Sequence, residues 1–185
     1  MGRGFRRAVR LTLSPNAEWQ AIRGEPFDQR SLLVSFVLPL ACIPAVSLGI
    51  GLAWFGSPAV DGLVQVMHRG AVAYFGLLAS IYLLAASMFV LAPLFVPGRS
   101  WALAFKLAAY SSAPVMLCGV LLVYPEFAYA LILPALHCFY LQYAGAHLIL
   151  GVKEDQAAEF VALGIVLLTV GSTLLGAFGA WLGIL

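Results

Sequence analysis

Long apolar runs alternate with short polar connections along most of this chain. Where water is absent, each backbone amide must be hydrogen-bonded within its own helix. About 20 consecutive apolar residues are therefore needed to cross a hydrocarbon core about 30 Å thick. Five runs are long enough, and they predict membrane-spanning helices at residues 31–55, 71–96, 102–124, 127–151 and 157–185. The predicted fold is an all-α membrane protein, a five-transmembrane-helix bundle preceded by an amphipathic interfacial segment.

The segment before the first run is basic, and Pro15 divides it into two parts. Helical spacing places Phe5, Val9 and Leu13 on one side of the first part, and Pro15 predicts the start of a second short helix that carries Trp19. Such segments lie in the headgroup layer, where arginines meet anionic lipid. Simple anchoring of the first span by positive charge is the favoured interpretation, and a specific protein-docking arm is the alternative. We predict an arm that contacts anionic headgroups or a partner through Arg3, Arg6, Arg7, Arg10 and Trp19.

Composition and charge agree with this division of the chain. With 63% hydrophobic and 10% charged residues, the sequence is too apolar for a soluble domain of 185 residues. It divides into residues 1–30, a basic amphipathic cytoplasmic segment, and residues 31–185, the transmembrane domain. Basic residues stay on the cytoplasmic side during insertion, which predicts a cytoplasmic N-terminus and an outer C-terminus. Arg69 alone would lie outside, opposite Arg3, Arg6, Arg7, Arg10, Arg23, Arg30, Arg99, Lys106 and Lys153.

Polar side chains concentrate in the fourth predicted span. At about 100° per residue, His137, Tyr140, Tyr143 and His147 fall within roughly a third of the helix circumference. Because polar groups facing lipid are costly, we expect this stripe to face the bundle interior, with Tyr110, Ser111 and Ser112 of the third span as partners. Interhelical hydrogen bonding is one interpretation, and a proton relay or metal site is the other.

Small residues and prolines indicate how the spans pack. Small side chains permit close helix approach, and they recur in the first span (Ala41, Ala45, Gly49, Ala53) and in the fifth (Ser172, Gly176, Ala180). We expect these faces to pack within the monomer, with homodimerisation through the fifth span as the alternative. Kinks are expected at Pro39, Pro44, Pro93, Pro114 and Pro134.

The connection between the first two spans carries a further helix signal. Ser57 and Pro58 form a good helix start, and apolar residues recur at helical spacing up to Met67. The pattern predicts either a short interfacial helix or an extension of the second span.

No catalytic or cofactor-binding motif is present. The sequence lacks a HExxH zinc site, a GxSxG nucleophile, a phosphate-binding glycine loop and any pair of carboxylates within the spans. We predict no catalytic residues, no cofactor and no metal site, and therefore a protein that is not an enzyme. Nucleic acid is not an expected partner.

Several short motifs resemble those of prokaryotic members of the Yip-one domain family, polytopic proteins named for interacting with Ypt/Rab GTPases. They are Pro15, Trp19, Ile22 and Glu25 before the first span, Tyr110-Ser111-Ser112-Ala113-Pro114 with Gly119 and Tyr124-Pro125 around the third, and Tyr143 with Leu150-Gly151-Val152 at the end of the fourth. The resemblance covers nearly the whole chain. It implies five spans with a cytoplasmic N-terminus, a location in the cell inner (plasma) membrane, and no catalytic residues.

Eukaryotic members of that family are associated with vesicle trafficking and membrane shaping. They carry a longer N-terminal region with an Asp-Leu-Tyr-Gly-Pro motif, which this chain lacks, so GTPase binding does not carry over. We therefore expect a non-enzymatic scaffold or membrane organiser whose arm meets anionic lipid or a membrane-protein partner. The alternative is a small transporter or channel built on the kinked first, third and fourth spans.

Overall fold

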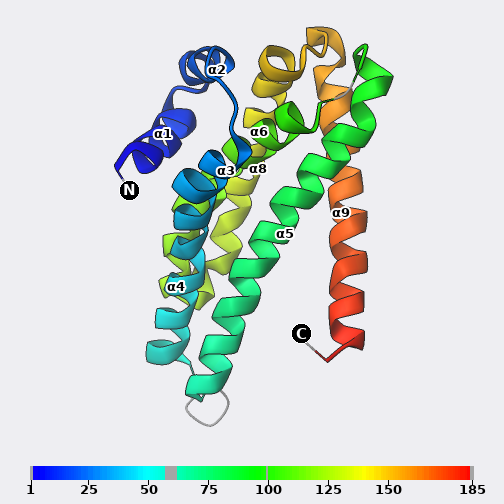
Figure 1. The fold of residues 1–185 in the computed structure, drawn as a ribbon. Coiled ribbons are helices and arrows are strands. Elements are labelled where there is room, and N and C mark those ends of the chain that lie inside the picture. The colour runs from blue at the N-terminus through cyan, green and yellow to red at the C-terminus, as the bar shows by residue number, and fades with distance from the viewer. Residues whose placement is uncertain (1, 57–61, 99, 184–185) are drawn as a thin grey trace.

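The computed structural model describes residues 2–56, 62–98 and 100–183, with side chains from residue 4 onward. These described residues form helices joined by short turns, and they contain no strand. Five helical stretches are long and apolar enough to cross a membrane. They pack as a bundle, and a two-helix arm folds against one end of it (Figure 1). The predicted all-α, five-span architecture is confirmed.

The helices have the following bounds. The arm contains α1 (Gly2–Leu13) and α2 (Pro15–Arg23). The first span contains α3 (Gln29–Leu32), the π-helix η1 (Leu33–Val37) and α4 (Leu38–Phe55). The second is α5 (Leu63–Phe95). The third joins α6 (Trp101–Ser111), α7 (Ala113–Cys118) and the 3₁₀ helix η2 (Gly119–Val123). The fourth joins the 3₁₀ helix η3 (Pro125–Leu131), α8 (Ile132–Gly145) and the π-helix η4 (Ala146–Leu150). The fifth joins the 3₁₀ helix η5 (Glu154–Gln156) to α9 (Ala157–Trp181).

The second span differs most from its prediction. We predicted its start at residue 71, but α5 begins at Leu63 and runs without interruption for 33 residues. For the preceding connection we predicted either a short interfacial helix or an extension of the second span. The described residues show the extension. Ser57 and Pro58, the predicted helix start, lie outside the described residues, as do Arg99 and the last two residues of the predicted fifth span.

Close backbone contacts join the first and third spans. Pro114 lies in the first turn of α7, where its missing amide proton interrupts the third span after α6. Further along, a Cβ added to Gly119 would lie 2.5 Å from a side-chain carbon of Pro44, and one added to Gly51 would lie 2.5 Å from the carbonyl oxygen of Leu122. Glycine at both positions therefore allows α4 to pack directly on η2.

The two small-residue faces have different surroundings. In the first span Ala41 is fully buried, and Gly49 faces Val66 of α5. In the fifth span Ser172 is exposed, and no atom lies within 4 Å of a Cβ built on Gly176. The expectation of packing within the monomer holds for the first face and is wrong for these fifth-span residues, because the far half of α9 lies away from the other spans (Figure 1). Homodimerisation stays a prediction.

Candidate functional site

The arm is part of the folded core. The proline at the first position of α2 separates it from α1, as predicted. Ala8 and Leu11 of α1 and Trp19 and Ile22 of α2 are fully buried, and they belong to the same hydrophobic cluster as the spans. Phe5 and Leu13 lie on the other side of α1 and are exposed. One face of α1 thus packs on the bundle, and a second apolar face points outward.

Trp19 is the largest side chain buried by the arm. Its ring meets the Tyr110 ring edge-on, with centroids 6.3 Å apart. A Cβ added to Gly145 of α8 would lie 2.8 Å from an indole carbon, so the absence of a side chain there makes room for the ring. The prediction that Trp19 contacts lipid or a partner is wrong, because α6 and α8 enclose it.

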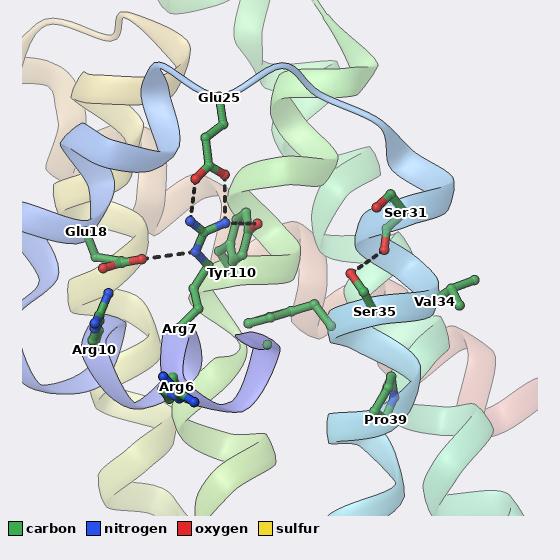
Figure 2. Close-up of a pocket in the computed structure, with 12 residues that line it drawn as sticks. Arg6, Arg7, Arg10, Glu18, Glu25, Ser31, Val34, Ser35, Pro39 and Tyr110 are labelled. Carbon is green, nitrogen blue, oxygen red and sulfur yellow. Dashed lines mark hydrogen bonds and ion pairs between the residues drawn. The ribbon is translucent and has the colours of Figure 1, made fainter. Parts of the chain in front are cut away.

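Arg7 is the centre of a polar contact between the arm and the third span (Figure 2). Its Nε donates to Glu18 Oε1 at 3.0 Å, and its Nη1 donates to Glu25 Oε2 at 2.7 Å and to the Tyr110 hydroxyl at 3.3 Å. Its Nη2 also donates to Glu25 Oε1, which makes the Glu25 contact bidentate. This hydrogen bonding raises the pKa of Arg7 above its ordinary value and lowers that of Glu25 below its own.

Lys106 ties the same region to the end of α2. It lies in α6 and is only 4% exposed. Its Nζ donates to the carbonyl oxygens of Ile22, at 2.5 Å, and Glu25, at 3.1 Å. These carbonyls lie at the C-terminal end of α2 and just beyond it, where a positive charge is favourable. We call the group Arg7, Glu18, Glu25, Lys106 and Tyr110 the junction.

Sequence reasoning found only part of this site. It counted Lys106 as a charge that sets the orientation of the chain in the membrane. It did not consider Glu18 as a partner for Arg7 of the same arm. A usable signal existed, because acidic residues in an arm and a lysine inside an apolar run both require partners. Some of the residues that carried the family resemblance lie at separate places in the sequence but meet at or beside the junction. They are Trp19, Ile22, Glu25 and Tyr110.

A cleft of about 1060 Å³ lies between α1 and the first span, next to the junction. Arg6 and Arg10 are exposed at its edge, and within the described residues they form no ion pair. Arg3, also predicted to contact lipid or a partner, has a side chain outside the described part of the structure. The residues that line the cleft are Gly4, Arg6, Arg7, Arg10, Glu18, Glu25, Ser31, Val34, Ser35, Phe36, Pro39 and Tyr110.

The fourth-span stripe does not face the bundle interior. Tyr140, Tyr143 and His147 are exposed, so this part of the prediction is wrong. The stripe lies on the outer side of α8 and η4, because the side that packs inward carries Cys138, Leu141, Gln142 and Gly145.

The histidines of the stripe and the predicted third-span partners form hydrogen bonds with other groups, not with each other. His137 has Nε2 3.0 Å from the carbonyl oxygen of Thr12 in the arm, and His147 has Nδ1 3.0 Å from that of Val152. Tyr110 and Ser111 are buried as expected, but Tyr110 bonds to Arg7, and the Ser111 hydroxyl donates to the Leu107 carbonyl at 2.7 Å. The stripe and the third-span residues therefore do not form one site. Among the described residues, no cluster of His, Cys, Asp or Glu is arranged to hold a metal ion.

Comparison with known proteins gives one match. The model of the Yip1 domain matches residues 9–182, which include most of the arm, all five spans and the junction except Arg7. No curated protein and no solved structure matches the chain. Because the family model covers nearly the whole sequence, this chain is a membrane protein that belongs to the Yip1 domain family.

Proposed function

We propose that this protein is a non-enzymatic membrane scaffold whose arm offers a fixed basic surface to anionic headgroups or a partner protein. The observation that carries the proposal is the docking of the arm. The five junction residues form hydrogen bonds with one another or with the arm backbone, so their polar groups hold the arm in place. Polar networks whose members are all satisfied make a structure rigid, which suits a fixed surface.

The position of α1 supports contact with a membrane surface. From Ser35 to Phe55 the first span extends for about 30 Å, which matches a hydrocarbon core. A Cβ on Gly4 would lie 2.6 Å from the Ser35 carbonyl oxygen, so α1 packs at that level. The exposed Phe5 and Leu13 then reach the acyl boundary, and the arginines of α1 lie among the headgroups.

We also propose that the end of the bundle with the arm faces the cytoplasm of a cell whose inner (plasma) membrane holds the protein. Arg6, Arg10, Arg23 and Lys153 are exposed at or near this end, and α2, the start of α6 and η5 lie there together (Figure 1). Arg69 lies in the part of α5 toward the opposite end. This asymmetry is the one that the positive-inside rule associates with a cytoplasmic face.

The test is crosslinking and co-purification from native membranes with variants that leave the core intact. Replacing Arg6, Arg10 and Arg23 with Gln removes exposed charge from the arm. The control is Arg30→Gln with Lys153→Gln, which removes two exposed charges outside the arm, one at the start of the first span and one in the connection before the fifth. If the protein is a scaffold, the arm variant should lose its crosslinked partners and the control should keep them. Identical crosslinking in all three proteins, or no partner in any of them, would contradict the scaffold.

The transporter or channel alternative has less support. It required the fourth-span stripe to line a path through the bundle, whereas Tyr140 and Tyr143 point outward and His137 contacts the arm backbone. The cleft beside the junction does not include His137. Flux measurements with His137→Ala would test it, since transport through the stripe requires that residue.

A further inference from the structure

The arginines around the cleft fall into two groups with different electrostatic states. Arg7 is held by Glu18 and Glu25, whose two negative charges exceed its own. Arg6 and Arg10 are four residues apart on α1, so they lie on the same side of the helix, and within the described chain neither forms an ion pair. Three arginines and two glutamates leave the cleft with a net charge of +1 (3 − 2). The unpaired positive charge lies on Arg6 and Arg10, which line the cleft and are exposed to solvent.

The opposite wall of the cleft carries no charge. It is formed by Val34, Phe36 and Pro39 of the first span together with Ser31 and Ser35, and Phe36 is buried against the Tyr110 ring. Val34 is 57% exposed at the mouth of the cleft. Exposed apolar side chains continue along α4 at Val46 and Ile50. The cleft is therefore cationic on one side and continuous with a lipid-facing apolar surface on the other.

We propose that this cleft binds one anionic phospholipid. The headgroup phosphate lies between Arg6 and Arg10, and the acyl chains follow the outer surface of the first span from Val34 onward. Arg7 does not bind the phosphate in this arrangement. It offsets part of the negative charge of Glu18 and Glu25, which would otherwise repel the anion more strongly. The inference rests on the proposed function, because it needs the arm at the membrane surface.

The shape of the cleft favours a lipid over free phosphate. A volume of about 1060 Å³ is larger than a phosphate ion requires, and it lies near the upper end of the range for small-molecule sites, about 300–1000 Å³. The exposed Arg6 and Arg10 guanidinium groups provide planar, forked sets of N–H donors that match the oxygens of a phosphate. Val34 and Pro39 provide a contact that only an amphiphile uses.

The experiment measures the lipid retained by the full-length protein. The purified protein is equilibrated with mixed micelles containing equal amounts of phosphatidylglycerol and phosphatidylcholine, and bound lipid is counted by native mass spectrometry. We expect wild type to retain one phosphatidylglycerol in preference to phosphatidylcholine. Arg6→Gln with Arg10→Gln should lower that retention about tenfold, the loss expected when roughly 1.4 kcal/mol of interaction is removed. The control, Arg30→Gln with Lys153→Gln, removes the same charge from exposed positions outside the cleft and should retain the lipid.

A second variant tests the cleft without removing an arginine. Val34→Glu places a carboxylate at the mouth, where it competes with the phosphate for Arg6 and Arg10, and it should reduce retention by a similar factor. Glycerol 3-phosphate, added as a soluble phosphate, should not displace the lipid at equal concentration.

An equal loss of bound phosphatidylglycerol in the cleft variants and in the control would mean that diffuse surface charge attracts the lipid. That result would overturn the proposed site. So would the absence of any preference for phosphatidylglycerol in wild type. Displacement by glycerol 3-phosphate would show a phosphate site that ignores the acyl chains, which also overturns the proposal. These readouts use purified protein, so they separate failure of the lipid site from failure of the scaffold, which native-membrane crosslinking measures.

Discussion

The junction and the fourth-span stripe both place polar side chains beside long apolar helices, but their surroundings differ. At the junction, Arg7 and Lys106 bond to groups on the arm that are close in space and distant in sequence. Along the stripe, Tyr140 and Tyr143 point away from the bundle. The comparison teaches that complementary charge on two different elements marks a real contact, whereas a shared face on one helix does not say which way that face points.

The largest expected effect is on the free energy of unfolding, and it follows from the difference in burial between the two regions. Trp19→Ala removes a fully buried indole from between α6 and α8, and it should lower the free energy of unfolding by about 3–5 kcal/mol. Tyr140→Ala removes a side chain that is 47% exposed, and it should cost less than about 1 kcal/mol. Denaturant unfolding in detergent micelles measures both. Similar losses would mean that the stripe is as well packed as the junction.

The next effect compares two arginines on the same helix. Arg7→Met leaves Glu18 and Glu25 without their cation, and the expected loss is about 2 kcal/mol, between the values for exposed and buried ion pairs. Arg10→Met removes an exposed arginine that has no ion pair within the described residues, and should change stability by less than about 0.5 kcal/mol. Hydrogen exchange of the α1 amides, alongside unfolding, shows whether the arm itself is released. If the two variants behave alike, the junction does not hold the arm.

A smaller effect appears in the pH dependence of stability. Hydrogen bonding from Arg7 lowers the pKa of Glu25 in the folded chain below its ordinary value of 4.5. The stabilisation is therefore fully present above about pH 4.5 and is lost as the pH falls through the lower, folded value. Because the Glu25 side chain is 42% exposed, solvent screening limits the effect to below about 1 kcal/mol.

Glu25→Gln is the matched variant for this titration. The difference in unfolding free energy between wild type and Glu25→Gln should shrink as the pH is lowered from 6.5 toward 3. A difference that stays constant over this interval would show that the carboxylate charge of Glu25 contributes nothing to the docking of the arm.

The spans could be predicted from sequence, whereas the site could be predicted only in part. Apolar run length is a local property, so five helices were found, with ends within a few residues except at the start of the second span, where α5 begins at Leu63 rather than residue 71. The direction of the polar face of α8 depends on where α1 and α6 pack, and the pattern of α8 alone does not contain that information. Lys106 and Glu18 were missed as partners for the same reason, because their contacts join the arm to the third span and the two halves of the arm.

The smallest expected effect concerns the polar side chain that α8 does bury. Gln142 is 2% exposed, and within the described residues its Oε1 has no hydrogen-bond donor. A buried acceptor without a partner costs about 1–3 kcal/mol, so Gln142→Leu, which keeps a similar volume, should leave stability unchanged or raise it slightly. Tyr143→Phe, on the exposed side of the same helix, is the control and should be neutral.

A marked loss of stability in Gln142→Leu would change the interpretation of α8. It would mean that the Gln142 amide accepts a hydrogen bond in solution, and Trp19 is the natural donor to examine. The indole Nε1 of Trp19 is the other buried side-chain atom without a partner in the described structure, and Trp19 packs against Gly145, one turn from Gln142. A double-mutant cycle with Trp19→Phe would then measure the coupling. Strong coupling would extend the polar contacts of the junction into the fourth span, through a residue on the inner face of α8.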